Sequence, residues 1–525
     1  MDKNRVIIDG NNLKIEDLYN VVNNNYVVSF PENKTFFTKL KKSREFLESY
    51  ITKGYPVYGV TTGFGDSSDN QIHPEHSHLL QKYLVSYHGI GMGDYFSDRE
   101  GKAITLARLN SNIKGYSAIR VELAEFMINL LNKNISPVIP KLGSVGASGD
   151  LTPLSYLAAA IMGDRNVYYK GEIIPTKEAF KSENITPLTL EAKEGLALMN
   201  GTSVMTAIIS LAWMDIKRLA NISDFITGAT VETLEGNDLP YIEKVNLIKN
   251  HKGQVESANY ITSVIKDSSR PRKYEELLKN IGTINKDLYK KNDIKIQDRY
   301  SLRCAPHING VLRDTLSFTK DWIENELNSS NDNPLIDEEN NIIYNSGNFY
   351  GGHISLAADY LRVAVANISD LAEKQSELII DGKFNNLTPN LIPFINDPSK
   401  MGIFHGFKAA QITMTALVSE INFLSAPVSV HSRPTESLNQ DKVSLGTISV
   451  RKLQEQIELL YMQYALHIMA LSQAMDLIGI DKFGSFSNKV YNEVRSLSKF
   501  VEEDRALDTD ARKIVSLLKD SELFY

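Results

Sequence analysis

The segment Gly143–Leu154 contains a tripeptide whose residue types could build an electrophile. Ala147, Ser148 and Gly149 follow one another within it. A glycine amide nitrogen is unhindered and lies on a bendable backbone, so it can attack the carbonyl carbon two residues upstream if the loop is held compressed. The attack closes a five-membered ring, and loss of water from the serine then leaves an exocyclic methylidene. The tripeptide could therefore become a methylidene-imidazolone, an electrophile that no ordinary side chain provides.

Other chemistries fit this loop less well. It lacks the lysine of a phosphate-binding P-loop and any G-x-G-x-x-G pattern, and Asp150 stands where a nucleophile elbow needs glycine. A flexible turn between helices is the structural alternative. Thr152 and Pro153 suit an N-cap and a first helical residue, so the apolar helix Ser155–Met162 should point its positive end at the loop.

Gly143–Leu154 closely resembles the signature of the histidine and aromatic amino acid ammonia-lyase family. The resemblance implies a mainly α fold like that of histidine ammonia-lyase, with a mixed N-terminal region and a long central helical bundle. It also implies removal of ammonia from an α-amino acid with loss of a β-proton, which gives an α,β-unsaturated acid. Further family motifs occur in the family's order and extend the resemblance over nearly the whole chain: Tyr58–Gly65, Leu198–Thr202, Gln297–Cys304, Asn331–Pro334 and Gly347–Phe349.

The resemblance assigns chemical roles to residues that match the family motifs. A 4-methylidene-imidazol-5-one formed from Ala147, Ser148 and Gly149 would capture the substrate amine as a covalent catalyst, with no external cofactor. Tyr58 matches the catalytic tyrosine that takes the β-proton. Because a phenol has an ordinary pKa of about 10, its site must favour the phenolate. Tyr300 is the other catalytic residue that the resemblance implies.

The residues expected to bind the substrate combine charged, polar and apolar side chains. Arg303 offers a planar fork for a carboxylate, and a salt bridge is its alternative role. Helical spacing would place Gln297 and Tyr300 on the same face as Arg303. By resemblance, Asn200 hydrogen-bonds near the prosthetic ring or the substrate carboxylate; its alternative is a core asparagine satisfied by backbone. Phe349 would pack close to the ring, or simply fill apolar space.

Substrate choice in this family follows the residues that meet the substrate ring. His88 stands where histidine-specific and many tyrosine-using relatives carry a histidine, which suggests a polar ring. Histidine enzymes also carry a glutamate near Asn439–Asp441. This chain has Gln440 there, and a neutral amide cannot pair with an imidazolium as a carboxylate does. We therefore expect tyrosine rather than histidine as the substrate, and coumarate as the product. Tyr87 replaces a serine common in close relatives, so a narrower pocket or a different substrate is the alternative.

Three rivals to a tyrosine ammonia-lyase remain open. The first is a histidine ammonia-lyase that forms urocanate, and the second is an aromatic amino acid 2,3-aminomutase, which returns the ammonia to the β-carbon. The third is a non-catalytic helical assembly protein, in which Ala147–Gly149 would stay uncyclised. Neighbouring subunits complete the site in this family, so the resemblance also implies a homotetramer with shared active sites.

Composition excludes several other classes. The chain has 525 residues, a formal net charge of −7 and 42% hydrophobic content, which is typical of a globular protein with a large core. No concentrated basic face indicates a nucleic-acid partner. The single cysteine, Cys304, favours a reducing compartment, and the first five residues lead into no apolar run that could serve as the h-region of a signal peptide. We therefore expect a cytoplasmic protein.

Two further patterns have the outward form of membrane spans and of a metal site. The uncharged stretches Gly195–Met214 and Leu459–Met475 carry polar residues near their middles, so we expect buried helices rather than membrane spans. His73, His76 and His78 lie close together, but Pro74 interrupts their spacing and no H-E-x-x-H motif exists. No metal site is therefore expected.

Hydrophobic spacing predicts the elements that must position these residues. Residues 1 to about 65 mix short β-branched runs with a helix over Phe36–Lys53, and the spacing becomes helical from about residue 76. The long periodic segments Ile354–Ile380, Ile403–Leu424 and Val450–Ile478 predict core helices of a bundle.

Two regions follow from these patterns. The predicted domains are 1–220, which carries the loop Gly143–Leu154, called the prosthetic loop, and the catalytic tyrosine, and 221–525, which holds the bundle and the C-terminal helices. The charged segment Asp267–Lys295 is expected to form a surface excursion from the second domain.

Overall fold

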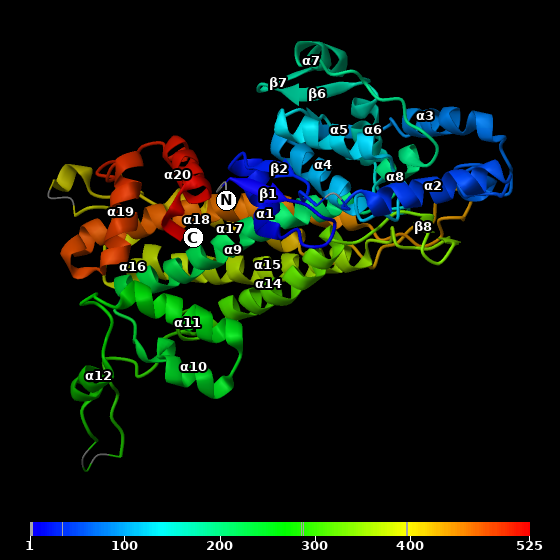
Figure 1. The fold of residues 1–525 in the computed structure, drawn as a ribbon. Coiled ribbons are helices and arrows are strands. Elements are labelled where there is room, and N and C mark those ends of the chain that lie inside the picture. The colour runs from blue at the N-terminus through cyan, green and yellow to red at the C-terminus, as the bar shows by residue number, and fades with distance from the viewer. Residues whose placement is uncertain (1–3, 34, 285, 287, 395–396, 525) are drawn as a thin grey trace. The chain divides into compact units, whose positions relative to one another are not determined.

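Helices make up most of the protein, as the computed structural model shows (Figure 1). The mainly α prediction is therefore confirmed. The structure describes residues 4–33, 35–284, 286, 288–394 and 397–524. The first three residues, which belong to the expectation about a targeting segment, lie outside this description. Among the described residues, no helix combines the length and the apolar character needed to cross a membrane.

The chain divides into two compact units that interleave along the sequence. The first unit comprises Met1–Met214, Thr319–Asp359 and Pro427–Lys452. The second comprises Asp215–Phe318, Tyr360–Ala426 and Leu453–Tyr525. The predicted domain boundary near residue 220 stays a prediction.

The first unit combines helices with small sheets. Its strands are β1 (Arg5–Ile7), β2 (Val27–Ser29), β3 (Met92–Tyr95), β4 (Ser136–Pro137), β5 (Pro140–Leu142), β6 (Asn166–Tyr169), β7 (Glu172–Pro175), β8 (Leu335–Asp337) and β9 (Ile342–Tyr344). β1 and β2 are parallel, whereas β3 pairs with β5, β6 with β4 and β7, and β8 with β9 in antiparallel fashion. These short pairings fix the ends of the loops between the helices.

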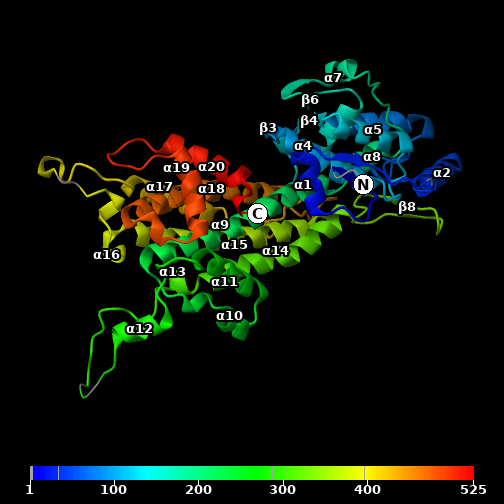
Figure 2. The same ribbon diagram turned by 60° about the vertical axis from the view of Figure 1, so that its left-hand side comes forward.

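Several helices lie wholly in the first unit. They are α1 (Ile15–Asn23), α2 (Thr38–Thr52), α3 (Ser77–Tyr87), α4 (Asp98–Asn112), α5 (Val121–Asn132), α6 (Leu151–Ile161), α7 (Thr176–Ser182) and α8 (Glu194–Met199). α6 packs against α3 and α8. α4 packs against α5 (Figure 2). α4 starts with a capping box in which the Glu100 carboxylate accepts from the backbone N–H of Ser97, and from Gly101 to its end the helix is buried.

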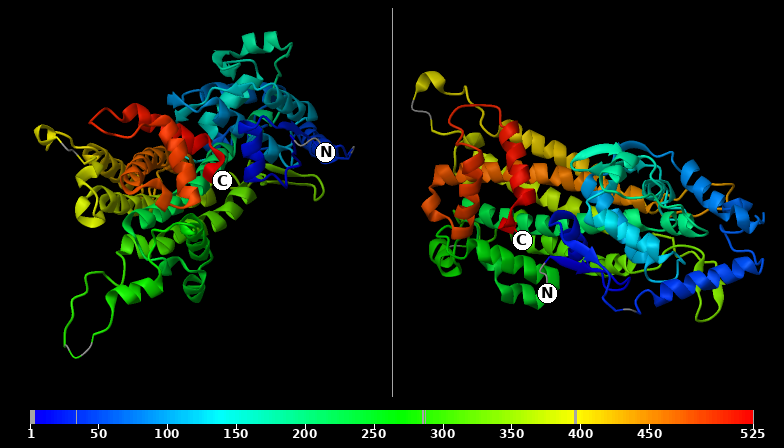
Figure 3. Two further views of the ribbon diagram at one scale, coloured as in Figure 1. Left: turned by 90° about the vertical axis from the view of Figure 1, so that its left-hand side faces the viewer. Right: turned by 45° about the horizontal axis from the view of Figure 1, so that its top comes forward.

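The second unit is a helical bundle (Figure 3). Its own helices are α10 (Glu243–Lys249), α11 (Lys252–Ile265), α12 (Tyr274–Ile281), α13 (Tyr300–Arg303), α16 (Gly382–Asn385), α17 (Lys408–Phe423), α19 (Ser485–Leu497) and α20 (Asp508–Asp520). Both units include parts of α9 (Ser203–Leu234), α14 (Ala305–Leu327), α15 (Gly352–Ile380) and α18 (Gly446–Ile478). Buried amides tie the bundle helices together, with Gln463 bonded to Ser369, Gln375 to Thr227, and Asn309 to Asp224.

Hydrophobic periodicity located most helices well. The uncharged stretches 195–214 and 459–475 lie in α8, α9 and α18 and are largely buried, so the prediction of buried helices is confirmed. α17 begins at Lys408, later than the predicted start at Ile403. Residue 403 ends a turn, and residues 404–405 have no regular secondary structure. In the charged excursion, α12 is present, and residues 285 and 287 lie outside the described part of the chain.

The predicted start of the helix after the prosthetic loop is wrong by two residues. α6 begins at Leu151, and Asp150 rather than Thr152 occupies the N-cap. Thr152 and Pro153 therefore lie inside the first turn. The reason is long-range: the backbone N–H of Asp150 donates to the carbonyl oxygen of Gly201 at 2.7 Å, which fixes the chain direction before the helix starts.

A buried ion pair joins distant segments of the first unit. The ammonium of Lys193 lies 2.6 Å from a carboxylate oxygen of Asp332, and both side chains are fully buried. The hydroxyl of Ser117 donates to the other carboxylate oxygen at 3.1 Å. A buried charge is costly without its partner. Removing Lys193 or Asp332 alone should therefore lower the stability of the protein by much more than the intact ion pair adds to it.

We predict that Asp332→Ala lowers the free energy of unfolding by about 3–5 kcal/mol, because it leaves Lys193 uncompensated. The matched control is Asp370→Ala. The carboxylate of Asp370 lies 3.0 Å from the ammonium of Lys374, whose side chain is about half exposed. That change should lower the free energy of unfolding by about 0.5 kcal/mol or less. Guanidinium unfolding of both variants measures the difference, and equal losses would contradict the ion pair's structural role.

Candidate active site

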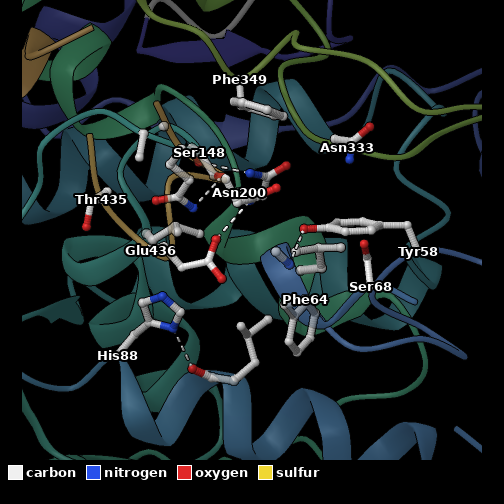
Figure 4. A pocket seen from close by; sticks show the side chains of 18 of the residues that line it. Tyr58, Phe64, Ser68, His88, Ser148, Asn200, Asn333, Phe349, Thr435 and Glu436 are labelled. Atoms are coloured by element: carbon white, nitrogen blue, oxygen red, sulfur yellow. Dashed lines mark hydrogen bonds between the residues drawn. The ribbon is translucent and has the colours of Figure 1, made fainter. Parts of the chain in front are cut away.

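One cavity of about 940 Å³ collects most of the predicted site residues (Figure 4). All of its lining residues belong to the first unit. They come from the loop after α2, the end of α3, the prosthetic loop, the end of α8, and two irregular segments near residues 345 and 440. The predicted residues among them are Tyr58, Tyr87, His88, Ala147, Ser148, Gly149, Asn200, Phe349 and Gln440.

The prosthetic loop lies against a second glycine-containing turn. Gly149 has φ +70°, and Gly201 has φ +147°. A Cβ atom on Gly149 would overlap the backbone of Gly201, so only glycine permits this approach. The two residues form a parallel bridge. The backbone is thus held in a tight bend at the residue that ring closure requires as nucleophile.

Two donors converge on the carbonyl oxygen of Ser148. The side-chain Nδ2 of Asn200 donates to it at 2.9 Å, and the backbone N–H of Gly201 donates at 3.2 Å. Paired donors of this kind stabilise negative charge that develops on an oxygen. Asn200 is 3% exposed, and its Oδ1 has no hydrogen-bond partner among the described residues. That oxygen is therefore a buried acceptor whose hydrogen-bonding capacity is unused by the described residues.

Asp150 clamps the loop to two other helices. Its carboxylate accepts from the backbone N–H of Met205 in the first turn of α9 at 2.9 Å and from the hydroxyl of Ser144 at 3.0 Å. The hydroxyl of Thr447, at the start of α18, donates to it as well. Burial raises the pKa of Asp150 to about 6, against which these hydrogen bonds act. No local sequence pattern predicts this role for Asp150, because Met205 and Thr447 are far away in the chain.

The segment 427–445, called the 427–445 strap, also holds the prosthetic loop. The backbone N–H groups of Ser444 and Leu445 donate to the carbonyls of Gly146 and Val145 at 3.1 and 3.0 Å. Gln440 on this strap donates from Nε2 to the hydroxyl of Ser148 at 3.3 Å. Hydrogen bonds therefore hold the loop on both sides.

Tyr58 lies on a turn, not on a strand, and its hydroxyl accepts from the backbone N–H of Gly65 at 2.9 Å. Burial raises the pKa of Tyr58, the Gly65 donor lowers it, and the charge of Glu436 raises it further. The balance disfavours the phenolate. The condition that the site favours the phenolate is thus not met by the described residues of this cavity.

His88 ends α3 and presents a hydrogen-bond acceptor to the cavity. Its Nδ1 lies 3.0 Å from the carbonyl oxygen of Leu84. A carbonyl only accepts, so Nδ1 carries the proton and Nε2 is the acceptor of the neutral ring. Burial lowers the pKa of His88, which favours that neutral form. The ring of Tyr87 lies beside it, with centroids 4.3 Å apart.

Glu436 is a cavity carboxylate that the sequence analysis missed. It accepts from the backbone N–H of Asp66 at 3.0 Å and from the side chain of Asn439 at 2.8 Å. In Figure 4 its side chain lies between those of Ser148 and His88. The preference for tyrosine over histidine depended on Gln440 in place of a glutamate. This preference is wrong on that point, because Glu436, four residues earlier, brings a carboxylate to the same cavity.

Gln297, Tyr300 and Arg303 belong to the second unit, and none lines the cavity. Tyr300 is 71% exposed, and the Arg303 guanidinium lies 4.5 Å from its ring centroid. Gln297 lies in a bend before α13, so the prediction that all three share one helix face is wrong for Gln297. The helix begins only at Tyr300, three residues later.

No cluster of three or more His, Cys, Asp or Glu side chains able to hold a metal ion exists in the part of the chain that the structure describes. The side chain of His73 instead accepts from the backbone N–H of Glu75, at the start of a short helical turn.

Comparison with known proteins now defines the class of protein. The family model for aromatic amino acid lyases matches residues 13–496. The histidine ammonia-lyase of Caldanaerobacter subterraneus subsp. tengcongensis is 35% identical over 519 residues, which cover 99% of this chain and 97% of that protein. That of Halalkalibacterium halodurans is 34% identical over 517 residues, which cover 98% of this chain and 96% of that protein.

The same similarity extends to solved structures. The tyrosine aminomutase of Streptomyces globisporus superposes with a TM-score of 0.91 at 32% identity, over 99% of this chain and 97% of that chain. The chain belongs to the aromatic amino acid lyase family. It is a carbon–nitrogen lyase with the histidine ammonia-lyase fold, so the alternative of a non-catalytic assembly protein is wrong.

We predict that Gly149→Ala destabilises the protein by about 1–3 kcal/mol more than Gly171→Ala. Both glycines lie in the first unit with φ near +70° to +83°, but a Cβ at Gly171 meets no atom within 4 Å. The pair therefore separates steric overlap from backbone strain. Guanidinium unfolding gives both values, and equal destabilisation would show that the close approach to Gly201 is unnecessary.

Proposed function

We propose that this protein is an amino acid ammonia-lyase that works with a methylidene-imidazolone formed from Ala147, Ser148 and Gly149. The observation that carries the proposal is the tight bend at Gly149 with two donors on the carbonyl oxygen of Ser148. A ring formed there would retain that oxygen as its carbonyl. The donors that hold the loop would then also withdraw electron density from the finished ring.

The residues around the tripeptide fit such a group. The bend at Gly149 excludes a side chain, Gln440 can help the hydroxyl of Ser148 to leave, and Asn200 with Gly201 holds the future ring carbonyl. When formed, the group supplies an electrophile for the substrate amine. No metal or external cofactor is part of the proposal.

The chain's own residues would do the remaining chemistry. Tyr58 would take the β-proton, and Glu436 would hold a positively charged group of the substrate. The unpaired Oδ1 of Asn200 would accept from the substrate amine or orient a water. Phe349 would cover the cavity from the side opposite His88 and limit access of water (Figure 4).

Histidine is the substrate we propose first. The curated relatives named above are histidine ammonia-lyases at 34–35% identity over nearly the whole chain. The cavity offers an imidazole ring two complementary groups: the acceptor Nε2 of His88 and the carboxylate of Glu436. A carboxylate can pair with an imidazolium, which Gln440 alone could not do.

Tyrosine is the second candidate, which the acceptor on His88 supports because a phenol hydroxyl would donate to it. The similarity to the tyrosine aminomutase of Streptomyces globisporus points the same way. Within this candidate, coumarate would be released by a lyase, whereas an aminomutase would retain it and add ammonia at the β-carbon.

The assembly we propose is a homotetramer in the cytoplasm. Gln297, Tyr300 and Arg303 would act in the cavity of a neighbouring copy, where Arg303 would bind the substrate carboxylate. The exposure of Tyr300 and the absence of all three from the cavity lining support this arrangement.

One experiment tests the proposed function. Purified protein is offered histidine, tyrosine and phenylalanine separately, and ultraviolet absorbance follows the conjugated acid. We expect the highest kcat/KM with histidine and no turnover by Ser148→Ala, which cannot form the methylidene. Activity of Ser148→Ala equal to the unchanged protein would contradict the mechanism, and preference for tyrosine would replace the first substrate by the second.

The titration of Tyr58 gives a separate prediction. Because its active form is the phenolate and its pKa is raised, kcat/KM should increase with pH above neutrality. Glu436→Gln removes a negative charge that raises this pKa, so the increase should move to lower pH by about half a pH unit. The control Asp441→Asn removes a cavity-lining carboxylate that is not among the causes of the shift. A Glu436→Gln profile that stays in place or moves to higher pH would contradict this account.

A further inference from the structure

Arg108 is a fully buried cation on α4. All of its hydrogen-bond partners are neutral: Ser111 Oγ at 3.1 Å, Asn112 Oδ1 at 2.8 Å, Asn331 Oδ1 at 2.9 Å and the backbone carbonyl of Asn200 at 3.1 Å. Among the described residues, no carboxylate lies within ion-pair distance of its guanidinium. A buried arginine is ordinarily paired with a carboxylate, so this charge needs another explanation.

The burial is severe enough to lower the pKa of Arg108 to about 10, although Asp332, Asp150 and Glu326 act on it from a distance in the opposite direction. The side chain therefore stays charged at neutral pH. Its charge is neutralised only in part and at longer range. A neutral side chain with the same hydrogen bonds would be cheaper to bury.

A single peptide group, between Asn200 and Gly201, connects the Arg108 guanidinium to the prosthetic loop by hydrogen bonds. Nη1 donates to the carbonyl oxygen of Asn200, and the N–H of the same peptide, on Gly201, donates to the carbonyl oxygen of Ser148 at 3.2 Å. Hydrogen bonds in such a chain polarise one another. A cation on the carbonyl side of the peptide thus makes its N–H a stronger donor toward Ser148.

Gly201 makes this arrangement possible. A Cβ on Gly201 would overlap both the Arg108 guanidinium and the side-chain oxygen of Asn331. The cation therefore approaches the peptide at a distance that any other residue would prevent. Together with the bend at Gly149, the two glycines bring Arg108, the 200–201 peptide and Ser148 into one line of contacts.

We propose that Arg108 is a positioning residue whose charge, acting through the 200–201 peptide, stabilises negative charge on the carbonyl oxygen of Ser148. The inference rests on the proposed function. During maturation, the amide nitrogen of Gly149 bonds to the carbonyl carbon of Ala147, and the oxygen of that carbonyl leaves as the first water. The Cα–H bond of Ser148 then breaks and its electron pair forms the Cα–Cβ double bond. The Cβ–Oγ bond breaks at the same time, and the leaving hydroxide takes up a proton as the second water. The carbonyl oxygen of Ser148 carries part of the negative charge as the proton leaves, which is where the relay would act.

Three substitutions separate charge from hydrogen bonding. Arg108→Gln can keep a donor to Asn200 without a charge, and Arg108→Lys keeps the charge without the planar fork. Asn331→Asp leaves Arg108 in place and sets a carboxylate of equal shape beside it. Each protein is made by cell-free synthesis, and intact-mass spectrometry follows the fraction that has lost two waters. Circular dichroism and the melting temperature check the fold of each variant.

We expect maturation about ten-fold slower in Arg108→Gln and in Asn331→Asp, with Arg108→Lys closer to the unchanged protein. In the matured fraction, kcat should fall more than KM changes. The matched control is Arg44→Met, which removes a largely buried arginine of the first unit that donates to the carbonyl of Ala192 at 2.7 Å. It should mature at the normal rate even though it loses stability.

Equal maturation rates in Arg108→Gln and the unchanged protein would overturn the inference, as would Arg108→Lys that is no faster than Arg108→Gln. If the Arg108 variants do not fold, Asn331→Asp decides alone, and its maturation at the normal rate would overturn the proposal. Failure of the unchanged protein to lose two waters would instead refute the proposed function itself. The two failures are therefore distinguishable.

Discussion

The backbone of residues 148–150 lies against that of residues 200–201, and the candidate site depends on this contact. It requires glycine at both Gly149 and Gly201, and it sets two donors on the carbonyl oxygen of Ser148. Asp150, tied to the first turn of α9 and the start of α18, holds one side of the loop, while the 427–445 strap holds the other.

In the proposed mechanism, fixed dipoles at this contact would serve two stages of one chemistry. While the loop is unreacted, donors on Ser148 would favour the bend and acidify the Cα–H of the serine. Once a ring is present, the same donors would draw electrons from it without any rearrangement, which is the advantage of a preorganised site over water. The polar groups behind the loop, Arg108 included, would then belong to the site as much as the groups that face the cavity.

The sequence was informative where the chemistry is contiguous. Ala147–Gly149 could be interpreted from residue types alone, and the long helices α15 and α18 follow from their hydrophobic period. Family resemblance then pointed to Tyr58, His88 and Asn200, which the structure brings to one cavity. Their catalytic roles remain proposals.

What the sequence could not provide depends on long-range contacts. Asp150 caps a helix that starts more than fifty positions later, and Arg108 meets Asn331 across 223 positions. Glu436 enters the cavity from an irregular strap without periodicity, so its approach to Asp66 had no local signal. The preference for tyrosine over histidine therefore depended on one position, Gln440, because the carboxylate of Glu436 could not be placed in the cavity from the sequence.

The most direct measurement is the mass of the proteolytic peptide that contains residues 147–149, taken from freshly purified, active protein. The account predicts a peptide lighter than its sequence by two waters, with the loss confined to these three residues by fragmentation. A peptide of unaltered mass in a preparation that eliminates ammonia would contradict the claim that this loop makes the electrophile.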